Sequence, residues 1–398
     1  MLYFCEGAPI GLLWGALPAY WKSEGMAVDR IGSITALLLV PWTLKWLWAP
    51  LVDWSSPWWS YRRWVISAQA VMGGTLALFA LLDPERHFPW MIAVLLVHAL
   101  AAATQDVSID ALCISTIEPQ SRGSVNGWMQ AGMLLGRALF GGGALYVLAR
   151  VSLATTIAML VAVLWSAAAL LALWRPRAEG RPTSESDVPA SDAGSPTRAS
   201  DWLAIVRDYR TWLALAFALI GGAAYEGVGA LLGPYLIDVG VTLESVGFFK
   251  LVPAPLALAI GALAGGRISD RFGHVRVTWC ALAALIALGV TLGLVQTFAG
   301  SGPMAWRWCI ITLQYAAVGT FTASSYALFM DLAAARWKAT LFSTMTGATN
   351  ACEAGSTYLA SQLAVRFGFG PTFIMMVVPS VLGLAIVPWL GRRPREGA

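Results

Sequence analysis

Five carboxylates interrupt long apolar stretches of this sequence, and they are its strongest candidates for chemistry. Asp106 and Asp110 are four residues apart, so a helix would place both on one face. A charge at the centre of a bilayer costs about 2.5–3.5 kcal/mol, so each such residue should face a cavity or a partner. Buried carboxylates can take up and release protons near neutral pH. The candidates for coupling to protons are Glu6, Asp106, Asp110, Glu226 and Glu353.

Amide and cationic side chains share these apolar stretches and predict a polar cleft. Asn126, Gln130 and Arg137 recur at helical spacing, and Asn350 belongs to a similar stripe. An arginine or lysine in such a cleft would hold an anionic group through charge-assisted hydrogen bonds. A structural alternative is that Arg137 pairs with an aspartate only to permit insertion into the membrane. The candidates for substrate binding are Gln105, Asn126, Gln130, Arg137, Lys250, Gln314 and Asn350.

Two loops carry a carboxylate close to basic residues, as expected for a gate. The segment 266–276 reads G-R-I-S-D-R-F-G-H-V-R, in which the glycines permit a short turn. Asp270 in this turn can pair with an arginine or with the positive N-terminus of a neighbouring helix. The earlier loop is looser, and the alternative is that these charges only anchor loops in solvent. The gating candidates are Asp53, Arg62, Arg63, Asp270 and Arg271.

Composition identifies the class of protein that must position these residues. Of 398 residues, 58% are hydrophobic and only 12% are charged, whereas soluble proteins carry about 25% charge. The chain is therefore a polytopic membrane protein, with the lipid bilayer as a partner. Its net charge of +4 is scattered along the chain, which argues against a nucleic-acid partner. The five cysteines lack pair spacing and are interpreted as small buried apolar residues, and the three separated histidines argue against a metal site.

A repeat predicts two related halves. The segment 25–32 reads G-M-A-V-D-R-I-G, and 215 residues later 240–247 reads G-V-T-L-E-S-V-G. Such a duplication in a membrane protein is typical of a transporter with its site between the halves. We predict an N-terminal half at 1–174, a largely disordered cytoplasmic linker at 175–210, which is polar and rich in Pro, Ser, Asp and Arg, and a C-terminal half at 211–398.

Twelve apolar segments are long enough to be helical spans, since about 20 residues cross the hydrocarbon core. If both termini are cytoplasmic, 17 Lys and Arg lie on the cytoplasmic side and 6 on the outer side, which obeys the positive-inside rule. The predicted fold is therefore all-α, with twelve transmembrane helices in two halves of six, the architecture of the major facilitator family. The predicted spans are 2–21, 30–50, 64–83, 90–113, 124–148, 152–174, 211–237, 243–266, 275–298, 304–330, 338–364 and 370–390.

Two stretches of the first half resemble the AmpG-like permeases of the major facilitator superfamily, a group related to acetyl-CoA transporters. Segment 44–53, L-K-W-L-W-A-P-L-V-D, looks like their K-F-L-W-x-P-L-x-D stretch. Segment 103–111, A-T-Q-D-V-S-I-D-A, resembles their A-[ST]-Q-D-x-x-x-D-A stretch. Lys250 stands where that family carries a lysine. Arg137 comes one turn later than the family's arginine, on about the same face but at a different depth.

The resemblance implies an importer driven by the proton gradient in the bacterial inner membrane, with no other cofactor. Its small-molecule substrate would be bulky and anionic or amphipathic. Two cargoes stay open, namely a muropeptide and a ferric siderophore, the latter carried by permeases of the RhtX/FptX kind. We expect a transporter that is not an enzyme and is a monomer.

Two hypotheses from other functional classes, an enzyme and a sensor, have less support in the sequence. In a membrane-embedded transferase, Asp106 and Asp110 would bind a Mg²⁺-diphosphate, but the sequence has no second aspartate-rich cluster to complete such a site. A non-transporting sensor would be supported by a long signalling domain, and none is present in this sequence.

Overall fold

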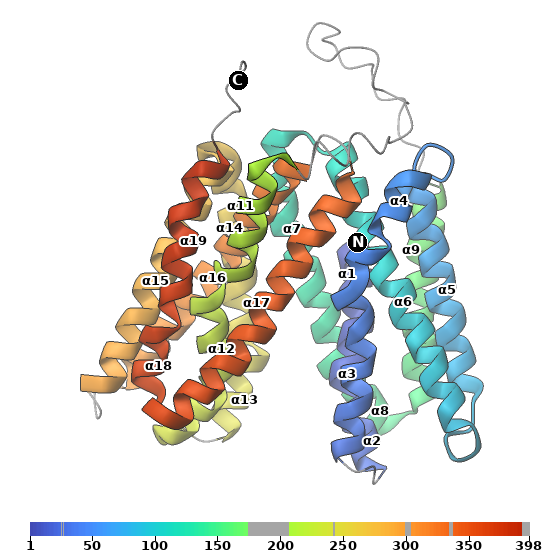
Figure 1. The fold of residues 1–398 in the computed structure, drawn as a ribbon. Helices are drawn as coiled ribbons and strands as arrows, with labels where there is room; N and C mark the ends of the chain where they lie inside the picture. The colour runs from blue at the N-terminus through green and yellow to red at the C-terminus, as the bar shows by residue number, and fades with distance from the viewer. Residues whose placement is uncertain are drawn as a thin grey trace, which may run out of the picture. The chain divides into compact units, whose positions relative to one another are not determined.

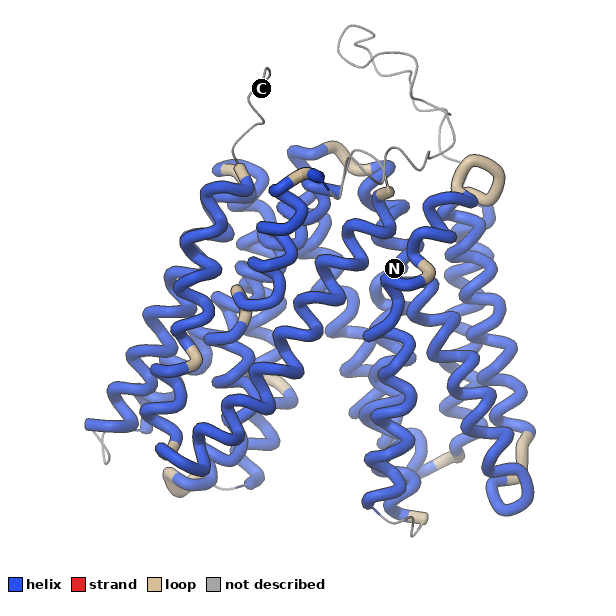
Figure 2. Tube along the Cα trace, viewed as in Figure 1, coloured by secondary structure: helices blue, strands red, loops and turns tan. Residues whose placement is uncertain are grey.

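The computed structural model of this chain consists of helices, and none of the residues it describes forms a strand (Figures 1 and 2). The described residues are 1–24, 26, 28–173, 207–241, 243–298, 304–333 and 337–391. Of the predicted linker at 175–210, residues 175–206 lie outside these ranges.

The chain divides into two compact units. Unit 1 comprises the described parts of Met1–Thr116, Gly132–Leu203 and Ala335–Ser343. Unit 2 comprises the described parts of Ile117–Ala131, Ala204–Ala334 and Thr344–Ala398. Each unit therefore takes most of its residues from one half of the sequence and a short segment from the other half.

The helices of unit 1 carry the N-terminal candidates. In chain order they are α1 Leu2–Gly11, the π-helical turn η1 Leu12–Ala16, α2 Leu17–Ser23, α3 Val28–Leu44, the 3₁₀ turn η2 Lys45–Leu47, α4 Ala49–Ser55, α5 Tyr61–Leu81, α6 Pro84–Thr116, the π-helical turn η4 Leu139–Gly143, α8 Ala144–Arg150 and α9 Leu153–Leu173. Helix α7, Arg122–Ala138, begins in unit 2 and ends in unit 1.

Unit 2 holds the second half of the chain together with the 3₁₀ turn η3 Pro119–Ser121. Its helices are α11 Tyr209–Ile220, α12 Ala223–Asp238, α13 Leu243–Leu251, α14 Pro253–Phe272, α15 His274–Phe298, α16 Met304–Ala333, α18 Phe369–Met375 and α19 Val377–Leu390. Helix α17, Lys338–Phe367, begins in unit 1 and continues in unit 2.

Every predicted span coincides with a described helix or with a run of consecutive helical segments. The segmented spans include one that is broken at Gly221 and Gly222 and another that is broken just before Pro253, where proline removes a backbone donor. Among the described residues, seven helical stretches meet the length and hydropathy expected of a membrane span. They are Tyr61–Leu81, Arg86–Thr116, Leu153–Leu173, Tyr209–Asp238, Phe248–Phe272, His274–Phe298 and Phe369–Leu390.

The prediction that all five cysteines are buried is wrong for two of them. Cys5 and Cys352 are buried and Cys113 is partly buried, whereas Cys280 and Cys309 are exposed. Both exposed residues lie on long helices, α15 and α16. An apolar residue of a membrane protein need not be buried in protein, because lipid is itself an apolar environment.

Helices α1 and α7 meet at glycines within unit 1. A Cβ atom at Gly7 would lie 2.0 Å from the carbonyl oxygen of Met133, and one at Gly11 would lie 2.5 Å from that of Arg137. Gly136 of α7 meets the carbonyl oxygen of Phe4 in the same way, at 2.4 Å. Small residues are what allow two membrane helices to bring their backbones this close. The contact fixes α1, which carries two residues of the candidate site described below.

Replacing Gly7 by alanine should therefore destabilise the protein, because the new methyl group would collide with the backbone of α7. Overpacking of this kind costs about 1–3 kcal/mol. The thermal unfolding midpoint of the detergent-solubilised protein measures the effect. Gly74→Ala is the matched control, since nothing lies within 4 Å of a Cβ atom at that helical position. Equal midpoints for the two variants would contradict the close contact.

Candidate functional site

A buried cluster of charged and polar side chains lies within unit 1. The ammonium group of Lys45 is 2.5 Å from Oδ2 of Asp106, and the hydroxyl of Tyr3 donates to Oδ1 of Asp110. These residues come from η2, α6 and α1. Exposed fractions of 3% for Lys45, 5% for Asp106 and 1% for Asp110 show that little solvent screens their charges.

Glu6 adds a third carboxylate to the interior of unit 1. It is 6% exposed, and its Oε2 has no hydrogen-bond partner among the described residues. Glu6 and Tyr3 are three positions apart on α1 and so share one face of the helix. A buried carboxylate oxygen without a partner is costly when the group is ionised. A proton on one of these carboxylates would reduce that cost, so the cluster has the chemistry of a proton-exchange site.

The break between α3 and α4 brings Lys45 into the interior. Helix α3 ends at Leu44, and residues Lys45–Leu47 form a 3₁₀ turn before α4 begins at Ala49. Pro50 stands in the first turn of α4, where its missing N–H is tolerated. The turn places Lys45 against Asp106 rather than at a membrane surface. The structural alternative offered Arg137 as the partner of one of the two aspartates, and the partner that the structure gives Asp106 is Lys45.

Two further predicted binding residues, Gln105 and Arg137, belong to unit 1. Gln105 is fully buried, and neither of its amide atoms has a hydrogen-bond partner among the described residues. Arg137 lies in the part of α7 that belongs to unit 1, and its side chain is exposed. Tyr3 was missed by the sequence analysis, although its spacing from Glu6 was a usable signal.

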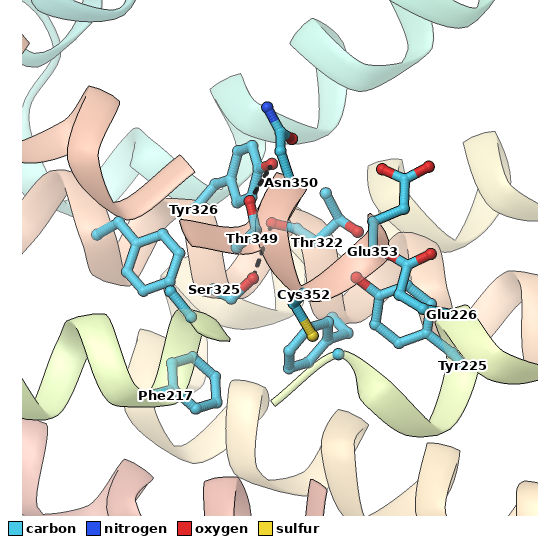
Figure 3. A pocket seen from close by; sticks show the side chains of 14 residues that line it. Phe217, Tyr225, Glu226, Thr322, Ser325, Tyr326, Thr349, Asn350, Cys352 and Glu353 are labelled. Atoms are coloured by element: carbon cyan, nitrogen blue, oxygen red, sulfur yellow. Dashed lines mark hydrogen bonds between the residues drawn. The ribbon is translucent and has the colours of Figure 1, made fainter. Parts of the chain in front are cut away.

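Unit 2 contains a cavity of about 70 Å³ between α11, α12, α16 and α17 (Figure 3). Three predicted residues, Glu226, Asn350 and Glu353, line it together with aromatic rings and hydroxyl groups. In Figure 3 the Glu226 carboxylate lies beside the hydroxyl of Tyr225. The full lining is Phe217, Ala218, Gly222, Tyr225, Glu226, Phe321, Thr322, Ser325, Tyr326, Phe329, Thr349, Asn350, Cys352 and Glu353. Such a lining can accept hydrogen bonds from a polar group and pack against an apolar one.

The remaining predicted binding residues of unit 2 do not line this cavity. The amide nitrogen of Asn126 donates to the carbonyl oxygen of Arg122 at 2.9 Å and contacts the sulfur of Met330 at 3.2 Å. Gln130 and Gln314 are buried. Lys250 is exposed on α13. The predicted site residues are therefore divided between the two units. Within each unit, only some of them lie in the cluster or the cavity described above.

Asp53 caps the start of a helix in unit 1. Its Oδ2 accepts from the backbone N–H and the hydroxyl of Thr340, at 2.7 and 2.6 Å, and its Oδ1 accepts from the N–H of Ala339 at 3.0 Å. The hydroxyl of Tyr61 donates to the same Oδ1 at 2.8 Å. These bonds satisfy backbone donors in the first turn of α17, which has no earlier turn to bond them. Burial raises the pKa of the Asp53 carboxyl above its ordinary value, although these hydrogen bonds act to lower it.

Asp270 caps a helix in unit 2 in the same way. Its two oxygens accept from the N–H groups of Gly123 and Ser124, at 2.6 and 2.7 Å, at the start of α7. A Cβ atom at Gly123 would lie 2.0 Å from Oγ of Ser269, so glycine is needed for this approach. Of the two pairings expected for Asp270, the structure shows the one with a helix N-terminus, and Asp53 makes the same kind of contact.

The predicted gating arginines have other partners. Arg62 donates from Nε and Nη2 to the carbonyl oxygen of Leu171, at 2.9 and 2.5 Å, near the end of α9. Arg63 donates to the carbonyl oxygen of Trp58 at 3.0 Å. The Arg271 guanidinium lies 5.4 Å from the centre of the Phe272 ring.

Comparison with known proteins supports a transporter. The family described as Major Facilitator Superfamily matches residues 1–357 of this chain. The Anhydromuropeptide permease of Escherichia coli K12 is 27% identical over 300 residues, which cover 74% of this chain. The chain spans only 57% of that relative's length. The Putative transporter AmpG 4 of Rickettsia felis is 20% identical over 417 residues, covering 99% of this chain and 95% of the relative.

Solved structures resemble the chain over nearly its full length. The Escherichia coli fucose:proton symporter FucP aligns with a TM-score of 0.76 at 14% identity, covering 98% of this chain and 97% of that one. A bacterial homologue of the iron transporter ferroportin in an outward-facing state gives 0.72 at 17% identity, with 98% of both chains covered. Identities this low carry information on the fold alone, and they confirm the predicted fold class.

Breaking the Lys45–Asp106 pair should destabilise the protein strongly. Lys45→Met would leave a buried carboxylate without its partner, and such a change costs about 3–5 kcal/mol. Adding Asp106→Asn should restore most of the loss, because the second change removes the unpaired charge. Thermal unfolding midpoints of the single and double variants test this, and the exposed 3.9 Å pair of Arg86 and Asp83 supplies the control Arg86→Met. A double variant no more stable than Lys45→Met would refute the pairing.

Proposed function

Because this chain belongs to the Major Facilitator Superfamily, we propose that it is a proton-coupled importer of a muropeptide-like solute in the bacterial inner membrane. The observation that carries the proposal is the buried cluster of unit 1, in which carboxylates outnumber the ammonium group of Lys45. On the distribution of Lys and Arg, both termini face the cytoplasm. The transporter acts as a monomer and draws its energy from the proton gradient.

Charge balance supports proton coupling at this cluster. Glu6, Asp106 and Asp110, if all ionised, would place three negative charges against two cations, Lys45 and the Arg137 that acts on Glu6, where water scarcely reaches the carboxylates. An excess of buried charge is costly, so protons are the natural means of balancing it. A proton on Asp110 would change its hydrogen bonding, because a protonated carboxyl group can donate as well as accept. Protonation thus changes which groups are paired inside unit 1, a local event of the kind that drives conformational switches.

The cavity of unit 2 supports a cargo with both polar and apolar surfaces. Asn350 and the two glutamates offer acceptors for hydroxyl or ammonium groups, and the aromatic rings offer apolar contact. Glu226 and Glu353 are also secondary candidates for proton coupling. The Escherichia coli relative named Anhydromuropeptide permease favours a muropeptide over a siderophore as cargo.

The first experiment is uptake into proteoliposomes under an imposed inward proton gradient. Labelled anhydro-muropeptide and a labelled ferric siderophore are supplied in parallel to the full chain. Gradient-dependent uptake of the muropeptide alone is the expected result. Uptake of the siderophore alone would transfer the proposal to the second cargo, and uptake of neither would overturn both.

Asp110→Asn should abolish the response to the proton gradient while preserving exchange of cargo across the membrane. The asparagine can still accept the hydrogen bond from Tyr3 but cannot carry a proton between the two sides. Gradient-driven uptake and counterflow are measured on the same liposomes. Glu118→Gln, an equal change of charge at an exposed loop residue, is the control. Normal gradient-driven uptake by Asp110→Asn would remove Asp110 from the coupling set.

Arg137→Gln should weaken cargo binding more than it weakens folding, because an exposed guanidinium can donate charge-assisted hydrogen bonds to an anionic group. Losing a charge-assisted hydrogen bond costs about 1.5–3 kcal/mol, or roughly a tenfold or larger rise in the cargo concentration for half-maximal uptake. The unfolding midpoint is recorded beside uptake. A large fall in the midpoint with unchanged half-maximal concentration would make Arg137 a structural residue.

A further inference from the structure

His274 bridges two carboxylates within unit 2. It is the first residue of α15, and its side chain is buried. Its Nδ1 lies 2.6 Å from Oδ2 of Asp331, near the end of α16. Its Nε2 lies 3.3 Å from Oδ1 of Asp270, near the end of α14. The imidazole therefore joins the ends of two helices to the start of a third.

The same two carboxylates hold the start of α7. Asp270 accepts from the backbone N–H groups of Gly123 and Ser124. Asp331 accepts from Nη1 of Arg122 at 2.7 Å, and the Arg122 side chain is buried. The contacts close a ring of hydrogen bonds through α14, α15, α16 and α7. We call this set, Arg122, Gly123, Ser124, Asp270, His274 and Asp331, the α7 clamp.

The geometry requires the charged form of His274. A neutral imidazole has one N–H donor and one acceptor nitrogen, whereas the imidazolium donates from both nitrogens. A carboxylate oxygen faces each ring nitrogen, so either neutral tautomer would turn a lone pair toward a negative charge. The charged groups facing His274 are Asp270 of α14 and Asp331 of α16, with Arg122 of α7 behind Asp331. With the imidazolium present, the four charges sum to zero.

We propose that His274 is a proton-operated switch that closes the α7 clamp when protonated and releases it as the pH rises. Loss of the proton removes one of the two imidazole bonds, and the longer contact with Asp270 is the one that opens. The bond between Asp270 of α14 and His274 of α15 is then broken, so Asp270, which caps the start of α7, is no longer held by the imidazole. Because α7 continues into unit 1 beyond Ala131, the clamp controls the start of a helix that both units share. The distribution of Lys and Arg assigns this turn to the cytoplasmic side, so the switch would respond to cytoplasmic pH.

This switch is separate from the proposed proton coupling, which rests on the carboxylates of unit 1. The cluster of unit 1 would carry protons as part of each transport cycle. The α7 clamp would instead set how readily the start of α7 is released at a given pH. Its test therefore needs neither cargo nor a proton gradient, and its failure would leave the proposed cargo and coupling untouched.

A buried thiol at position 269 would report the opening of the clamp. Ser269 is fully buried, and its hydroxyl lies against Gly123, where a Cβ atom would approach it to 2.0 Å. Ser269→Cys is introduced into the full chain with the five native cysteines, Cys5, Cys113, Cys280, Cys309 and Cys352, replaced by alanine. The rate of labelling by N-ethylmaleimide is measured between about pH 6 and pH 8, where histidine titrates. Each rate is divided by the rate for the SDS-unfolded protein at the same pH, which removes the effect of thiol ionisation.

The corrected labelling rate with His274 present should rise with pH, by up to about tenfold per unit, since release of the clamp is linked to the loss of one proton. His274→Arg keeps a permanent cation, so its rate should stay low and independent of pH. His274→Gln should label quickly at every pH. The other two histidines, His87 and His98, are present in all three proteins. A difference in labelling between the three proteins therefore reports on position 274 alone.

The comparison with His274→Arg decides the proposal even if the glutamine variant fails to fold. An equal rise with pH in the parent and in His274→Arg would overturn the switch, because another group would then carry the pH dependence. A flat profile in the parent would overturn it as well.

Discussion

The cost of leaving a charge or a backbone donor unpaired where water is scarce governs the placement of the polar residues in this protein. Asp53 and Asp270 show the constraint most directly, because each carboxylate accepts backbone N–H groups at the start of a helix. The first backbone N–H groups of a helix need hydrogen-bond acceptors, and a buried carboxylate needs hydrogen-bond donors. One contact between them therefore satisfies both groups. Both helices held in this way, α7 and α17, have residues in each of the two units.

Close backbone packing is the second element on which the candidate sites depend. In unit 1, Gly7 and Gly136 let α1 and α7 approach, so that Tyr3 and Glu6 are held on the inner face of α1. In unit 2, Gly123 lets the start of α7 reach Ser269 and the Asp270 carboxylate. Without a hydrophobic driving force between helices in lipid, such close contacts supply much of the packing energy. The close packing at the glycines thus decides which polar side chains can come within reach of one another.

The two units enclose different sets of polar side chains. Unit 1 encloses a carboxylate-rich cluster around Lys45, which suits the binding and release of protons. Unit 2 encloses a small cavity with acceptors and aromatic rings, which suits a polar organic group. The pairing of Asp106 with Lys45 shows that part of the charge in unit 1 is balanced within the protein.

The sequence by itself determined the membrane class, the helical spans, the fold family and the carboxylates that the structure buries in unit 1. The hydropathy of a segment and the free-energy cost of a charge within it depend only on the residues of that segment. Both can therefore be judged from the sequence. Only the tertiary structure decided the pairings, because a partner on another helix has no fixed spacing in the sequence. It chose Lys45 rather than Arg137 for Asp106, and a helix start rather than an arginine for Asp270. The bridging place of His274 likewise arises only when the ends of α14 and α16 meet the start of α15.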